Sequence, residues 1–183
     1  MKTVQRIFKN IHGKELRVEI DSFSENTISI LVENTESSVE RRKLLKVAGF
    51  IGSLYAALVF LGSPFGLILG HILMLFLTLL PIYLHTKVVE SESVTFIRHF
   101  GLQNTIKYSK NRVKNLLIPA HTIHDIIINE VIHHQRVIFM LQILLEGETS
   151  HEGKIHSLFK NTKPNLSCLE FIYKTLHSRW RTS

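Results

Sequence analysis

The most prominent pattern in the chain is an apolar run from Val47 to Leu84 that contains no Asp, Glu, Lys or Arg. One bilayer crossing takes about 20 apolar residues, and this run is about twice that length. Its middle is interrupted by four residues that a helix interior tolerates poorly: Gly62, Ser63, Pro64 and Gly66. The run therefore predicts two helices, about 44–61 and 65–84, joined by a tight turn as a transmembrane hairpin. A hairpin buried in a soluble core is disfavoured, because neither segment has a polar face.

Charge at the ends of this run predicts its orientation. The basic residues beside the two helices are Arg41, Arg42, Lys43 and Lys46 before the first, and His85 and Lys87 after the second. Cationic flanks stay on the cytoplasmic side of a membrane, so we expect both termini in the cytosol. His71 lies inside the second helix, where an ionisable side chain is a functional candidate. A hydrogen bond from His71 to the neighbouring helix is the favoured interpretation.

Alternation of polar and apolar positions predicts strands on both sides of the run. Before it, Leu16–Asp21 and Thr27–Val32 flank a polar turn and predict a β-hairpin. After it, the segments expected to be strands are Ser93–Phe100, Leu102–Tyr108, Leu116–Ile118, Ile123–Ile132 and Val137–Leu145. Gly101 permits the turn between the first two of these. We expect about six strands in the soluble part of the chain.

The last element is predicted to be an amphipathic helix that begins after Pro164 and Asn165. Its apolar residues recur at intervals of three and four: Leu166, Leu169, Ile172, Tyr173 and Leu176. One such helix covers the open end of a curved antiparallel sheet. The fold class expected is therefore an α+β membrane protein, with a two-helix transmembrane hairpin and an antiparallel β-rich cytosolic domain with a C-terminal helix. The domains expected are 1–43, 44–85 and 86–183.

The charge of the chain favours a membrane surface over nucleic acid. The 183 residues carry a formal net charge of +7, which suits contact with anionic cytoplasmic-leaflet lipid. The basic residues are scattered instead of forming a basic helix, which disfavours nucleic acid as a partner. One basic loop is a candidate for lipid headgroups, through Lys107, Lys110, Arg112 and Lys114. An ordinary solvated turn is the alternative interpretation of this loop.

The sequence contains little that predicts catalysis or a cofactor. No glycine-rich phosphate loop and no alternation of strands and helices is present. Asp125 and Glu130 lie five residues apart on a predicted strand, so they face opposite sides and do not form a catalytic pair. The closely spaced histidines, His121 with His124 and His133 with His134, do not follow metal-ligand spacing. We therefore expect no catalytic residue, no metal and no cofactor.

Two surfaces are predicted to bind partner proteins. Small residues nearly share one stripe of the first apolar helix, where they let a second helix approach closely: Gly49, Gly52, Ser53 and Ala56. A lipid-facing stripe is the alternative. The predicted strand Ile123–Ile132 carries Asp125, Asn129 and Glu130 and can dock a partner by edge pairing. Another interpretation of Asp125 and Asn129 is that they bind backbone groups or a partner at the edge of the sheet.

Several stretches resemble the PIG-H family, over about residues 88–177. They read ESVTFIRHFGLQ, LIPAHTIHDIIINEVI, RVIFMLQILL and KPNLSCLEFIYKTL. The resemblance implies a non-catalytic, membrane-anchored subunit of the complex that transfers N-acetylglucosamine from UDP-N-acetylglucosamine to phosphatidylinositol. That transfer begins the synthesis of glycosylphosphatidylinositol (GPI) anchors. The implied location is the endoplasmic reticulum membrane, and the implied partners are the catalytic subunit PIG-A and other membrane subunits.

A second resemblance concerns architecture alone. An apolar helical hairpin followed by strands and a final helix is similar to bacterial membrane-anchored pleckstrin-homology-like domains. This likeness implies a small barrel or sandwich capped by the last helix, but a fold does not define a ligand. The alternative function is then a module that binds anionic lipid headgroups on its own.

Overall fold

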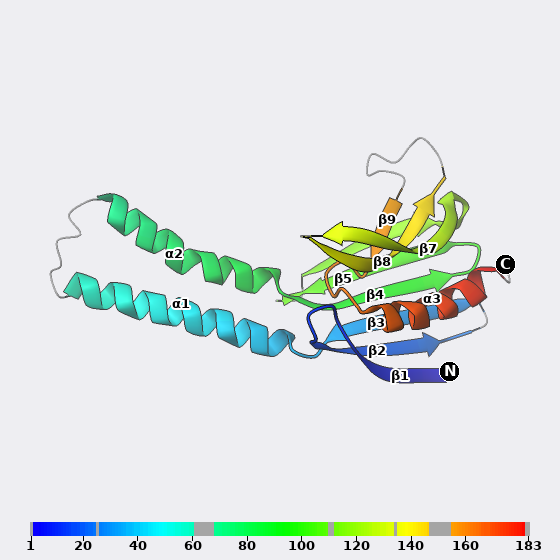
Figure 1. The fold of residues 1–183 in the computed structure, drawn as a ribbon, viewed down its shortest axis with the longest axis horizontal. Coiled ribbons are helices and arrows are strands. Elements are labelled where there is room, and N and C mark those ends of the chain that lie inside the picture. Colours follow the sequence, from blue (N-terminus) through cyan, green and yellow to red (C-terminus); the bar gives the residue numbers. More distant parts are fainter. Residues whose placement is uncertain are drawn as a thin grey trace. The chain divides into compact units, whose positions relative to one another are not determined.

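The computed structural model describes residues 2–24, 26–60, 68–109, 112–133, 135–146 and 155–181. The chain forms two compact units. Unit 1 contains Met1–Thr35, Val89–Lys107 and Arg112–Ser183, and unit 2 contains Glu36–Val88 and Tyr108–Asn111. Unit 1 is built from strands and one helix, whereas unit 2 is built from two helices (Figure 1).

The larger sheet has six strands whose spatial order follows the chain (Figure 1). They are β1 Lys2–Lys9, β2 Glu15–Ser22, β3 Thr27–Asn34, β4 Val89–Ile97, β5 Gly101–Tyr108 and β6 Val113–Pro119. The predicted β-hairpin is confirmed, because β2 and β3 pair antiparallel. β3 also pairs with β4, although all of α1 and α2 lies between them in the sequence. The sheet therefore joins the chain before unit 2 to the chain after it.

The smaller sheet and the last helix complete unit 1. The sheet has the order β7 Ile123–His133, β8 Arg136–Leu145 and β9 Ile155–Leu158, and a short 3-10 turn, η2 Ala120–Thr122, precedes it. The last helix, α3 Leu166–Arg181, contacts β1, β7 and β8. Its buried residues are Cys168, Leu169, Ile172 and Leu176, and they join the apolar faces of both sheets in one core. The predicted amphipathic helix is confirmed.

Two hydrogen bonds of Asn165, one through its side chain and one through its backbone, fix the start of α3. The Asn165 side-chain oxygen accepts a hydrogen bond of 3.1 Å from the Cys168 backbone N–H. This is an N-cap, which satisfies one of the amide groups left open at a helix start. Asn165 also donates its own backbone N–H to Lys9 of β1. The start of the helix is thereby tied to the first strand.

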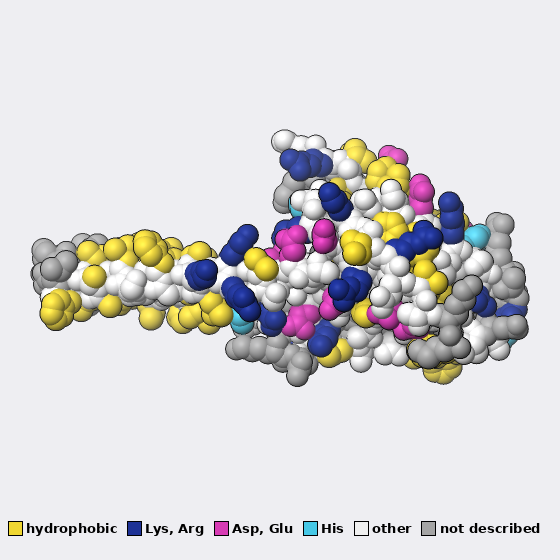
Figure 2. All heavy atoms as spheres, turned by 90° about the horizontal axis from the view of Figure 1, so that it is seen from below, with side chains coloured by type: hydrophobic (Ala, Val, Ile, Leu, Met, Phe, Trp, Pro, Cys, Tyr) yellow, Lys and Arg dark blue, Asp and Glu magenta, His cyan; other side chains and the backbone are white. Residues whose placement is uncertain are grey.

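Unit 2 consists of α1 Ser37–Phe60 and α2 Ile68–Lys87, which contact each other. Tyr55 of α1 lies 2.8 Å from His71 Nδ1 of α2, so the predicted hydrogen bond between the two helices is confirmed. Hydrophobic side chains cover the helices along their length, whereas charges of both signs lie on the visible face of unit 1 (Figure 2). None of the described side chains of α1 is buried.

The prediction of two membrane-spanning helices is wrong. Among the residues that the structure describes, only α1 is long and apolar enough to cross a membrane. Three polar or helix-breaking positions interrupt α2, at His71, at Pro81 and at the basic last turn with His85 and Lys87. The apolar stretch between them is shorter than the about 20 residues that a crossing needs. The predicted turn with Gly62, Ser63, Pro64 and Gly66 lies outside the described residues.

The predicted total of about six strands is also too low, because the structure has nine within the described ranges and two of these match none of the seven predicted segments. The two missed strands are β1 and β9. In β1, Ile7 is exposed although it is apolar, so the strand does not show a clean alternation. β9 has only four residues, which is too few for a periodic pattern to be recognised.

Candidate functional site

The strand predicted to dock a partner lies at an edge. β7 is the first strand of the order β7-β8-β9, so within the described residues one side of it has no neighbouring strand. An edge strand presents backbone N–H and C=O groups to an incoming chain. Its pairing with β8 is regular from Asp125 to His133, with one irregularity between Ile123 and Asp125. The geometry is therefore compatible with edge pairing.

The three polar residues predicted on β7 are not equivalent. The carboxylate of Asp125 accepts a hydrogen bond of 2.7 Å from the Ile126 backbone N–H. Asn129 donates to Gln142 Oε1 at 3.0 Å, and Gln142 donates onward to Ser157. Both residues thus bind groups of the chain itself, Asp125 a backbone amide and Asn129 a side-chain amide. Glu130 is exposed and faces the opposite side of the strand from Asp125.

The predicted headgroup loop is divided between two strands. Lys107 belongs to β5 and lies 3.7 Å from Glu90, whereas Lys114 belongs to β6. Lys107 pairs with Val113, while Lys114 pairs with Ile106, so the two lysines point to opposite faces of the sheet. Arg112 is exposed, and Lys110 lies outside the described residues. The described residues do not gather these charges on one face.

The small residues of α1 are not used for packing in the described part of the chain. A Cβ atom added at Gly49 or Gly52 would meet nothing within 4 Å. Ser53 and Ala56 are exposed, and the Ser53 hydroxyl donates to the Phe50 carbonyl of the same helix. The stripe remains a predicted contact for another helix.

The described residues offer little for nucleophilic or metal chemistry. No three His, Cys, Asp or Glu side chains among them lie close enough to hold a metal ion. Cys168 is buried in the core, and burial raises the pKa of its thiol from 9.0 to about 12. A thiol is nucleophilic as the thiolate, so Cys168 is in its unreactive form at neutral pH.

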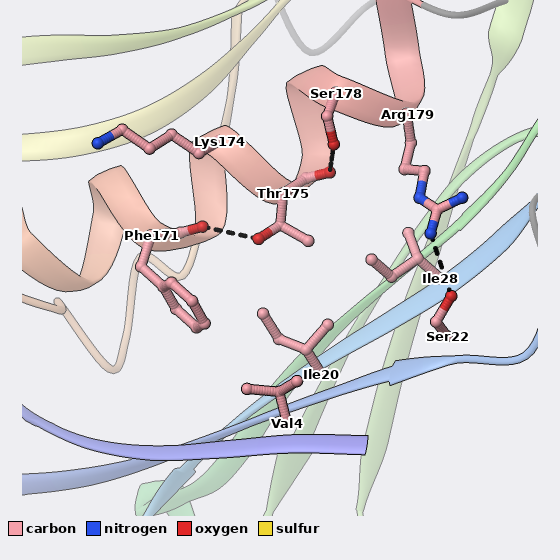
Figure 3. A pocket seen from close by; sticks show the side chains of 9 residues that line it. All are labelled: Val4, Ile20, Ser22, Ile28, Phe171, Lys174, Thr175, Ser178 and Arg179. Carbon is pink, nitrogen blue, oxygen red and sulfur yellow. Dashed lines mark hydrogen bonds between the residues drawn. The ribbon is translucent and has the colours of Figure 1, made fainter. Parts of the chain in front are cut away.

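A hollow of about 390 Å³ lies between α3 and the first three strands (Figure 3). Its floor is apolar, with Val4, Ile20, Ile28 and Phe171. Its hydroxyl groups are used inside the protein, since Thr175 donates to Phe171 and Ser178 donates to Thr175. Arg179 donates to Ser22, and Lys174 points away from the floor (Figure 3). This hollow presents no polar group that is set aside for a ligand.

A second hollow, of about 490 Å³, lies where the β1–β2 turn, the start of β8 and the segment before α3 meet. Its basic residues are His12, Arg136 and Lys163. The sequence alone did not reveal this site, because its residues are far apart in the chain and follow no motif. The basic character of the chain was the only signal that pointed towards an anion.

The comparison with known proteins concerns the region that contains this β-rich part. Residues 93–160 match the family model described as "GPI-GlcNAc transferase complex, PIG-H component". These residues are therefore similar to the PIG-H component and are called the PIG-H region below. This PIG-H region runs from β4 to the turn that follows β9 and contains the whole of β7 and β8. It does not include α1, α2 or α3.

Three named relatives extend the match. They are the PIG-H subunits of phosphatidylinositol N-acetylglucosaminyltransferase from Mus musculus, Homo sapiens and Bos taurus, each 33% identical to the chain over 105 residues. The match covers 55% of this chain and 56% of each relative. The chain thus spans about half the length of the curated relatives that it matches.

No solved structure matches the chain. The predicted likeness to pleckstrin-homology-like domains therefore has no support. Within the described residues, the strands form one sheet of six strands and a second of three. The fold is therefore described by its own strand order and helices, without reference to a known structure.

Proposed function

We propose that the chain is an accessory subunit of a GPI-N-acetylglucosaminyltransferase complex. The match of residues 93–160 to the PIG-H component carries this proposal. The complex would transfer N-acetylglucosamine from UDP-N-acetylglucosamine to phosphatidylinositol. The chain itself holds the catalytic glycosyltransferase subunit, PIG-A, beside the membrane that contains the lipid acceptor. Such positioning accelerates a reaction through proximity and orientation and needs no catalytic side chain in this chain.

The contact with the catalytic subunit is proposed at β7. This strand lies inside the PIG-H region and has an open edge among the described residues. Backbone pairing along the edge supplies affinity, and the side chains that alternate along the strand supply specificity. Glu130 is the polar side chain best placed for this role, because it is exposed while Asp125 and Asn129 bind groups within the chain.

The apolar surface of unit 2 is proposed to hold the chain at the endoplasmic reticulum membrane. Large apolar side chains are exposed on both helices, and contact with lipid or with membrane subunits removes them from water. The pairing of β3 with β4 supports the proposal that the chain before α1 and the chain after α2 lie on the same side of that membrane. The basic residues Arg41, Arg42, Lys43 and Lys46 favour the cytosolic side.

The test is affinity purification of the tagged full chain from detergent-solubilised membranes, followed by mass spectrometry. We expect the catalytic subunit at stoichiometric yield, together with other membrane subunits. The Glu130→Lys substitution is expected to lower that yield at least about tenfold, since reversing a contacting charge costs about 1.4 kcal/mol or more. Glu170→Lys is the matched control, because Glu170 is an exposed glutamate on α3.

Two results would contradict the proposal. One is a purified chain that brings no glycosyltransferase with it. The other is N-glycan at the Asn165-Leu166-Ser167 sequence, detected as a mobility shift after glycosidase treatment, because it would place unit 1 in the lumen. Equal loss of the catalytic subunit with Glu130→Lys and Glu170→Lys would argue against β7 as the contact and leave complex membership intact.

A further inference from the structure

The second hollow gathers basic side chains from three distant parts of unit 1. His12 comes from the β1–β2 turn, Arg136 begins β8, and Lys163 lies just before α3. The remaining walls are mainly apolar, with Ile11, Val137 and Phe139. A volume of about 490 Å³ lies within the range of small-molecule sites. The hollow thus combines positive charge with apolar walls.

Backbone hydrogen bonds hold His12 and Lys163 side by side. The Ile11 N–H donates to the Lys163 carbonyl at 3.1 Å, and Asn10 forms a bridge with Pro164. The Asn10 side-chain oxygen accepts from the His12 backbone N–H at 2.8 Å, which fixes the turn. These bonds leave the side chains of His12 and Lys163 available to a ligand.

A buried carboxylate holds the turn that carries Lys163. Glu92 of β4 is 1% exposed and accepts hydrogen bonds from the backbone and side chains of Asn161 and Thr162. Lys163 itself has a φ of 46°, a conformation that few residues other than glycine adopt. Glu92 forms no ion pair with Lys163 among the described residues. The turn is built so that Lys163 lies at the hollow.

The charge of the hollow is not compensated within the described part of the chain. None of the lining residues is acidic. The side chains of His12, Arg136 and Lys163 form no ion pair among the described residues. Arginine and lysine side chains bind phosphate through charge-assisted hydrogen bonds. A phosphate group is therefore the ligand that fits the basic side.

Ile132 and Val137 form an apolar rim beside the hollow, which indicates what kind of molecule carries the phosphate. Ile132 and Val137 face each other across the β7–β8 hairpin and are 81% and 59% exposed. Val137 also lines the hollow. Exposed apolar side chains beside cations are typical of protein surfaces that enter the interface of a membrane. An amphiphile meets both requirements, whereas a free phosphate ion leaves the apolar rim in water.

We propose that this hollow binds the phosphate of a phospholipid headgroup, with Ile132 and Val137 against the acyl side of the membrane interface. The basic residues hold the phosphate, and Ile132 and Val137 supply the apolar contact. The site differs from the predicted basic loop, whose described lysines face opposite sides of the sheet. It does not depend on the chain's membership of a transferase complex.

The test measures binding to the full chain purified in a neutral detergent. Calorimetric titrations use three probes: dioctanoyl phosphatidic acid, inorganic phosphate and uncharged dioctanoylglycerol. We expect the phosphatidic acid to bind at least about tenfold more tightly than inorganic phosphate, and dioctanoylglycerol not to bind. Arg136→Glu and Lys163→Glu are expected to raise the Kd for phosphatidic acid at least about tenfold, since each removes a charge-assisted hydrogen bond to the phosphate.

Matched variants separate the parts of the proposal. Lys160→Glu reverses an exposed lysine three positions from Lys163 that does not line the hollow, and it should leave the Kd within about twofold. Ile132→Asn, which removes the apolar side chain without adding a charge, should weaken binding of phosphatidic acid but not of inorganic phosphate. Thermal unfolding in the same detergent verifies that each variant is folded.

Three results would overturn the proposal. Equal affinity for phosphatidic acid and inorganic phosphate would mean that the site binds a free anion instead of a lipid. An equal effect of Lys160→Glu and Lys163→Glu would mean that only the general charge of the surface matters. Absence of binding to any probe by the folded wild-type chain would rule out the site. None of these results bears on the purification of the transferase complex.

Discussion

At the scale of single residues, Glu92 is a buried carboxylate that connects β4 to the turn before α3. It is buried and accepts hydrogen bonds from both Asn161 and Thr162, the shortest at 2.6 Å. Glu92→Gln replaces an acceptor oxygen by an N–H₂ group that faces other donors. Since a buried donor left unpaired costs about 1–3 kcal/mol, we expect a loss of about 2–4 kcal/mol in the free energy of unfolding.

Urea unfolding of the full chain in detergent measures this loss. Glu146→Gln is the control, because Glu146 is exposed and lies 4.0 Å from His124. A surface pair of this kind contributes less than about 1 kcal/mol. If both variants unfold at the same urea concentration, the role assigned to Glu92 is wrong.

Gly13 and Gly101 both have a positive φ, but only Gly101 lies close to another segment of the backbone. Comparing them distinguishes the cost of the backbone conformation from the cost of a steric clash. At Gly101 (φ 149°) an added Cβ would collide with the Ile118 carbonyl oxygen of β6. Gly13 (φ 81°) has nothing within 4 Å of the same position. We expect Gly101→Ala to destabilise unit 1 by more than about 3 kcal/mol, and Gly13→Ala by only about 1 kcal/mol. Melting temperatures of the two variants, measured side by side, decide the point, and equal shifts would contradict it.

Cys168 gives a prediction that depends on pH. Burial raises the pKa of its thiol from 9.0 to about 12, so the folded chain keeps the proton over a range in which the unfolded chain loses it. Its contribution to stability is therefore complete below pH 9 and is lost as the pH rises towards 12. Alkylation by iodoacetamide at pH 9 should be slow in the folded chain and fast in denaturant. Rapid alkylation of the folded chain would show that the thiol is accessible.

At the scale of elements, the small-residue stripe of α1 is predicted to contact a helix of another subunit. Gly49→Leu and Gly52→Leu fill space that is empty in the described chain, so α1 itself should tolerate them. They should nevertheless reduce co-purification of membrane subunits by about tenfold, because a large side chain keeps two helices apart. Val47→Leu, at an exposed position about 160° around the helix from Gly49 and about 140° from Gly52, is the control. Unchanged co-purification with both glycine variants would make the stripe a lipid-facing one.

The elements that were predicted well from the sequence are those in which apolar positions recur at a regular interval. In β2 and β3 every second residue is buried along most of the strand, and in α3 buried residues recur at intervals of three and four. The prediction of a second membrane-spanning helix was wrong because hydrophobicity was assessed over the whole apolar run instead of over each helix. The ends of the helices were not known, and α2 extends to the polar residues His85 and Lys87. Helix boundaries depend on such terminal residues, which a hydrophobic average does not resolve.

At the scale of the whole molecule, the two candidate sites differ in how far the sequence could predict them. The β7 site lies on one strand, so the polar residues within an apolar strand were visible in the sequence. Glu130 could be chosen over Asp125 and Asn129 only once the structure showed that the latter two form hydrogen bonds within the chain. The hollow with His12, Arg136 and Lys163 needed the pairing of the β1–β2 turn with residues 163–165. Contacts between segments so far apart are set by the tertiary fold and carry no local pattern.

The central claim is that this chain supports the sugar transfer of another subunit. The most direct measurement is transfer of radiolabelled N-acetylglucosamine from its UDP derivative to phosphatidylinositol. One sample is the complex captured through the tagged chain, and the other is the chain purified alone. We predict glycolipid product from the captured complex and none from the chain alone. Product from the isolated chain, or none from the captured material, would contradict the claim.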